Sequence, residues 1–68
     1  MLELVEFTLA KRTYNESGEK EWIEDKRVAI NPHMIISFRE HLIQAGAWEY
    51  NVMETYEQIK RKLWRWVG

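Results

Sequence analysis

The chain contains one stretch, residues 53–66, whose apolar residues recur at the spacing of a single helical face. Those residues are Tyr56, Ile59, Leu63 and Trp66. Thr55 followed by Gln58 has the form of a capping box, which predicts a helix start near Tyr56. A helix of about three turns is marginal by itself in water, so we expect the rest of the chain to cover its apolar face.

Length and composition limit how that cover can be built. A chain of 68 residues is expected to form one small domain, residues 1–68, and the absence of cysteine excludes disulfides and cysteine zinc sites. Stability must then come from apolar burial or from self-association. Glu3 and Glu6 lie near the start and no apolar run reaches membrane-spanning length, so we predict a soluble, cytoplasmic protein without membrane contact.

The first half of the chain predicts a long β-hairpin. Apolar and polar residues nearly alternate up to Tyr14, and the turn residues of the segment Asn15-Glu-Ser-Gly18 follow. The return strand runs to Ile30, and a bulge near residues 24–26 would restore Val28 and Ile30 to the buried face. We expect Trp22 to cover one edge of the sheet.

The second half predicts further strands before the helix. Asn31-Pro32 marks a corner, residues 34–43 alternate as one long strand, and residues 44–47 close a hairpin into residues 48–52. The predicted fold class is α+β, an antiparallel β-meander of four or more strands with one C-terminal α-helix packed on the sheet. The core candidates on the strands are Val5, Phe7, Val28, Ile30, Ile36, Phe38, Tyr50 and Val52.

Two segments carry a resemblance to a known family. They are VAINPHMIISFRE, from Val28 to Glu40, and ETYEQIKRKL, from Glu54 to Leu63, and together they resemble the small FlbD-like proteins of bacteria and their phage-borne relatives. The resemblance implies a strand, a corner at Asn31, a second strand and a closing capped helix. Members of that family have been linked to flagellar assembly or motility. This chain departs from the pattern in its longer first hairpin, residues 11–25, and in a shortened segment after residue 39.

Residues that could carry chemistry are scattered. His33 and His41 lack a second His or Cys at metal-ligand spacing. Residues 16–25 include five acids but lack the spacing of a calcium loop, and a solvated hairpin tip is the better interpretation. Neither serine has a base at a defined spacing. We therefore predict a protein that is not an enzyme and that holds no metal or cofactor.

Charge is distributed unevenly between the body and the helix. Residues 1–56 hold six Lys and Arg against ten Asp and Glu, a net charge of −4, whereas residues 57–68 hold four against one, a net charge of +3. The candidate partner-binding residues are Trp64, Lys60, Arg61, Lys62, Arg65 and Trp22. A basic helix end also complements the helix dipole, so a solvated surface is the simpler explanation of the charges.

Trp64 leaves three alternatives open. Its ring could pack over the helix flank or over Trp48, it could anchor a contact with a protein or with a second copy, or it could stack on a nucleic-acid base among the cations. Repulsion between phosphate and the acidic body argues against nucleic acid. The sequence thus favours a non-enzymatic protein-interaction or regulatory module of bacterial or phage origin, possibly homodimeric. The alternative is a small nucleic-acid-binding regulator that uses the basic helix.

Overall fold

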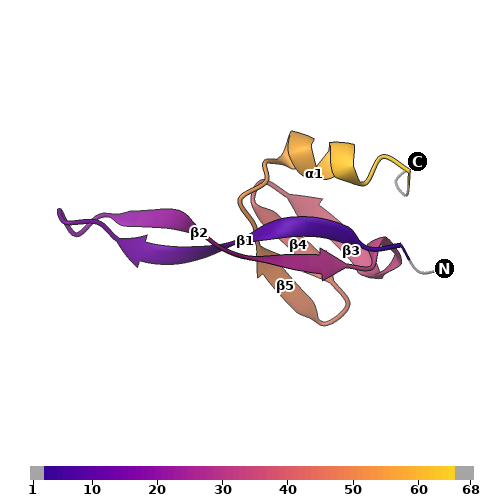
Figure 1. Ribbon diagram of the computed structural model, residues 1–68, viewed down its shortest axis with the longest axis horizontal. Helices are drawn as coiled ribbons and strands as arrows, with labels where there is room; N and C mark the ends of the chain where they lie inside the picture. Colours follow the sequence, from indigo (N-terminus) through magenta and orange to yellow (C-terminus); the bar gives the residue numbers. More distant parts are fainter. Residues whose placement is uncertain (1–2, 66–68) are drawn as a thin grey trace.

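The computed structural model describes residues 3–65 and arranges the strands in two antiparallel sheets, one with two strands and one with three, followed by a helix (Figure 1). The elements are β1 (Val5–Tyr14), β2 (Lys20–Ile30), the 3-10 helix η1 (Pro32–Met34), β3 (Ile35–Arg39), β4 (Leu42–Ala45), β5 (Trp48–Asn51) and α1 (Tyr56–Lys62). The predicted α+β class, with antiparallel strands and a C-terminal helix, is confirmed. The single meander is wrong, because β1 and β2 form a sheet of their own.

The first hairpin closes at the predicted turn. Tyr14 pairs with Lys20, and the Asn15 side-chain oxygen accepts the backbone N–H groups of Ser17 and Glu19, each at 2.9 Å. Gly18 adopts a φ of 79°, a conformation that a residue with a side chain rarely tolerates. Asn15 and Gly18 therefore form the turn as the sequence predicts, Asn15 through its side-chain hydrogen bonds and Gly18 through its positive φ.

The predicted bulge is confirmed in β2. Thr8 pairs with Arg27 whereas Ala10 pairs with Glu24, so one extra residue of β2 lies opposite Leu9. On the near side of this shift, Phe7 and Ile30 are buried in the body. On the far side, the two strands leave the body as a twisted ribbon, which gives the molecule its 46 Å length against a width of about 20 Å (Figure 1). We call residues 10–24 the ribbon.

The predicted strand over residues 34–43 is wrong. Glu40 and His41 form a turn that splits it into β3 and β4, and Phe38 pairs with Ile43. In an unbroken strand these two residues would face opposite sides, but across the turn they share the buried face. The turn has no glycine or proline, and His41 itself adopts the left-handed φ of 58°. Ile36, predicted in the core, is instead 67% exposed beside a register shift in β3.

Helix α1 begins as predicted and ends earlier. Thr55 and Gln58 form both hydrogen bonds of the capping box, which confirms the start at Tyr56. The helix ends at Lys62, shorter than residues 53–66, although Leu63 is buried with Ile59 as the apolar stripe requires. The Tyr56 ring stacks on Phe38 with 5.3 Å between centroids, so α1 packs beside β3. Trp66, the last residue of the predicted stripe, lies outside the described residues.

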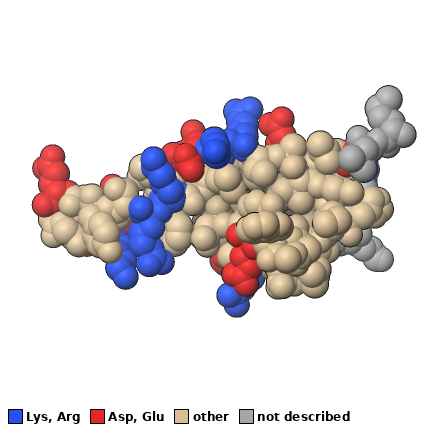
Figure 2. Space-filling model, turned by 90° about the horizontal axis from the view of Figure 1, so that it is seen from below, with Lys and Arg blue, Asp and Glu red and all other residues tan. Residues whose placement is uncertain are grey.

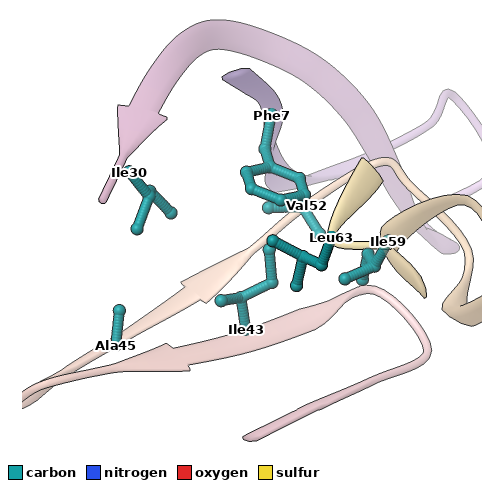
Figure 3. Close-up of a cluster of buried hydrophobic side chains, with 7 residues drawn as sticks. All are labelled: Phe7, Ile30, Ile43, Ala45, Val52, Ile59 and Leu63. Carbon is teal, nitrogen blue, oxygen red and sulfur yellow. The ribbon is translucent and has the colours of Figure 1, made fainter. Parts of the chain in front are cut away.

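The core forms where both sheets and the helix meet (Figure 3). Its buried apolar residues are Phe7, Ile30, Ile43, Ala45, Val52, Ile59 and Leu63. Among the predicted core residues, Val5, Val28, Phe38 and Tyr50 are partly buried against this cluster. The sequence interpretation missed Ile43 and Ala45, because the turn at residues 40–41 reverses which residues of this region face inward.

Candidate functional site

The two sheets join through the segment that leads into α1. Leu9 forms a β-bridge with Val52, and the Met53 N–H donates to the Thr8 carbonyl at 2.8 Å. The Thr8 N–H in turn donates to both carboxylate oxygens of Glu54 at 3.1 Å. Glu54 is only 8% exposed, so its charge requires partners inside the fold. Its carboxylate accepts a bond where a paired strand would offer a carbonyl.

Lys62 completes this junction and is therefore not part of a free partner-binding surface, contrary to the prediction. Its Nζ lies 3.2 Å from a Glu54 oxygen and donates to the Glu6 carbonyl at 2.8 Å. The same ammonium lies 5.3 Å from the centre of the Phe7 ring, within cation–π distance. Three interactions within the fold thus occupy a cation that the sequence interpretation had assigned to a partner.

The other predicted cations differ in their availability. Arg65 lies 3.9 Å from the Glu3 carboxylate, with both side chains largely exposed, a geometry that contributes little energy. Lys60 and Arg61 are exposed, and within residues 3–65 neither forms an ion pair. These two residues are therefore the cations of α1 that are free to meet a partner within the described part of the chain.

Trp64 follows Leu63, the C-cap of the helix, and is 72% exposed. Trp48 is equally open at 70%, so the alternative in which Trp64 packs over Trp48 or the helix flank is wrong. The indole is instead presented to solvent beside the free cations. We call Lys60, Arg61 and Trp64 the helix-end surface.

Trp22 lies on the ribbon, away from that surface. It pairs with Arg12, whose guanidinium lies 4.9 Å from the indole centroid, a stacking distance for a cation on an aromatic ring. Tyr14 is on the same face, two residues from Arg12, and is also exposed. Trp22 is 46% exposed, and the expectation that it covers a sheet edge stays a prediction. The predicted site residues therefore fall into two separate surfaces.

The remaining polar groups that could carry chemistry serve the backbone. An open hollow beside the junction is lined by Met53, Glu54, Gln58, Arg61 and Lys62. Two of its three charged residues, Glu54 and Lys62, already bond to each other and to the backbone. His41 lies with Nδ1 3.2 Å from the Val52 carbonyl, to which it can donate in the tautomer protonated at that nitrogen. Within the described residues, no three His, Cys, Asp or Glu side chains are grouped so that they could hold a metal ion.

Comparisons with known proteins assign neither a family nor a function to this chain. No protein-family model, curated protein or solved structure matches this chain. The resemblance to FlbD-like proteins thus stays a prediction. In the part of the chain that the structure describes, no helix is both long and apolar enough to span a bilayer.

Proposed function

We propose that this chain is a non-enzymatic interaction module of bacterial or phage origin, which acts by binding another protein or a second copy of itself. The observation that carries the proposal is the exposure of Trp64 near Lys60 and Arg61, two cations that form no ion pair with any residue from 3 to 65. Tryptophan and arginine are the residues most enriched in binding hot spots. The neighbouring apolar positions, Ile59 and Leu63, already fill the core, so packing within the described fold does not explain the tryptophan.

Nucleic acid is the weaker alternative. An exposed indole beside cations could stack on a base, as single-strand binders do. Lys62, however, is engaged by Glu54 and by the Glu6 carbonyl, which removes one of the expected phosphate contacts. The residues before the helix carry a net charge of −4, which repels phosphate.

A comparison of two tryptophan variants tests the proposed function. Immobilised wild-type protein, Trp64→Ala and Trp48→Ala are incubated with a bacterial lysate, and light scattering reports self-association of each. Loss of the retained partner or of self-association in Trp64→Ala, with Trp48→Ala unchanged, supports the proposal, because both indoles are similarly exposed. A wild-type protein that is strictly monomeric and retains no protein contradicts it.

The nucleic-acid alternative predicts a different result. Single- and double-stranded oligonucleotides would bind at low salt, weaken steeply as salt rises, and lose affinity in Lys60→Glu/Arg61→Glu. The absence of any binding at low salt removes this alternative.

A further inference from the structure

The ribbon is an element that the fold does not need for its core. Beyond the bulge its side chains are almost all exposed, including Tyr14, Trp22 and Ile23. A two-stranded hairpin with neither face packed is marginal in water. Large apolar side chains on such an element are therefore unexplained by the packing of the described residues, and they suit a surface that is covered in an assembly.

The outer end of the ribbon is also acidic. Residues 13–21 carry a net charge of −2, from Glu16, Glu19 and Glu21 against Lys20, whereas Glu24 lies beside the bulge, next to the body. Figure 2 shows acidic side chains at the outer end of the ribbon, with Lys and Arg nearer the body. Lys11 and Arg12 belong to the facing strand, and Arg12 is held over the Trp22 ring.

The complementary charge lies on the helix-end surface of the same chain. Lys60 and Arg61 supply two positive charges there and have no ion pair within the described residues, whereas Lys62 and Arg65 are already paired with Glu54 and Glu3. Both surfaces add an exposed aromatic side chain, Trp22 on the ribbon and Trp64 beside the cations. The ribbon end is thus acidic and carries an aromatic side chain, and the helix-end surface is basic and carries another.

These two surfaces do not meet within one molecule. The ribbon points away from the body along the long axis, and α1 lies over the other half of the molecule (Figure 1). The ion pairs among residues 3–65 join Arg27 to Glu6, Lys62 to Glu54 and Arg65 to Glu3, and none bridges the ribbon end and the helix.

We infer that the acidic end of the ribbon docks on the helix-end surface of a second copy, and that the exchange is reciprocal in a two-fold dimer. A two-fold contact is self-complementary, so each copy supplies one ribbon and one helix end. The inference rests on the proposed function and names its partner as the chain itself. The attraction is between exposed charges, so assembly weakens as salt screens them.

A simpler role exists for the ribbon charges alone. Charged side chains keep exposed strand edges from pairing with other chains. Lys and Glu protect a strand edge equally well. This role therefore explains neither the excess of acid at the outer end nor the exposed side chains of Tyr14, Trp22 and Ile23.

Charge reversal separates these explanations. The ribbon variant is Glu19→Lys/Glu21→Lys, the helix variant is Lys60→Glu/Arg61→Glu, and the matched control is Glu40→Lys/Glu49→Lys, which changes exposed acids elsewhere. Analytical ultracentrifugation measures the dimer dissociation constant at about 0.02 M and about 0.5 M salt. Circular dichroism checks that each variant is folded.

The inference expects a wild-type dimer that weakens with salt, and a dissociation constant raised about tenfold or more in each reversal variant. An equimolar mixture of the ribbon and helix variants should form a heterodimer. In it the reversed ribbon of one copy meets the reversed helix of the other, and the second contact keeps its wild-type charges. The control should dimerise as the wild type does. A wild-type monomer at low salt, or a mixture that stays monomeric, overturns the inference.

Failure of the inference and failure of the proposed function give different results. A monomer that still retains a protein partner through Trp64 refutes reciprocal docking and leaves the proposed function standing. A monomer that retains none contradicts both.

Discussion

The carboxylate of Glu54 lies 3.1 Å from the backbone nitrogen of Thr8 through both of its oxygens. A side chain thus satisfies a strand N–H beside the bridge between Leu9 and Val52, where ladder pairing between β1 and the chain after β5 ends. Because α1 starts two residues after Glu54, this contact also sets where the helix leaves the sheet.

Loss of the Glu54 charge should therefore destabilise the whole fold. Glu54→Gln keeps the shape of the side chain and removes the charge from its bonds to Thr8 and Lys62. Charge-assisted hydrogen bonds contribute about 1.5–3 kcal/mol, so we expect the free energy of unfolding to fall by about 2 kcal/mol in urea titrations. Glu49→Gln, on an exposed strand position, is the control and should change it by less than about 0.5 kcal/mol. Equal effects would contradict the structural role of Glu54.

The Glu54 and Lys62 contributions should be coupled. In a double-mutant cycle, Glu54→Gln and Lys62→Met share the 3.2 Å contact, so their effects on unfolding free energy should deviate from additivity by about 1 kcal/mol. Lys60→Met replaces an exposed cation on the same helix and should add to Glu54→Gln independently. Additivity in the Lys62 cycle would show that its ammonium does not depend on Glu54.

A pair of isoleucine truncations tests the turn that splits residues 34–43. Ile43 is fully buried whereas Ile36 is mostly exposed. Ile43→Ala should lower the free energy of unfolding by about 3 kcal/mol, and Ile36→Ala should change it by less than about 0.5 kcal/mol. Chemical denaturation measures both. The unbroken strand that the sequence pattern suggests places Ile36 in the core and predicts the reverse order.

The turns that were predictable from the sequence are those made by specialised residues. Gly18 and Gly46 adopt positive φ, and Asn31 accepts the His33 N–H at 3.0 Å ahead of Pro32. The turn at residues 40–41 depends on His41 and contains none of the Gly, Pro, Asn, Asp or Ser residues that usually mark turns. Its left-handed conformation is supported by tertiary contacts, because its carbonyl accepts the Val52 N–H and its ring faces the Val52 carbonyl.

The candidate site was predictable in its residue types and only partly in their roles. Lys60, Lys62 and Trp64 are alike in being near the helix end, and the helical period indicates which side of α1 each occupies. It does not indicate that Lys62 reaches the Glu6 carbonyl, 56 residues away in the chain. Such contacts depend on how β1 crosses the helix, which no local pattern specifies.

Shortening the ribbon should leave the core intact. Deletion of residues 11–14 together with residues 20–23 removes an even number of strand pairs, so the alternation of the ladder into the turn is kept. The deleted side chains are nearly all exposed, and the core side chains, such as Phe7 and Ile43, lie outside the deleted segments. We expect the unfolding free energy to change by less than about 1 kcal/mol, measured at high salt and low protein concentration, where dimerisation contributes little. A large loss would mean that the ribbon supports the body, and an unchanged free energy of unfolding would show that the core does not depend on the length of the ribbon.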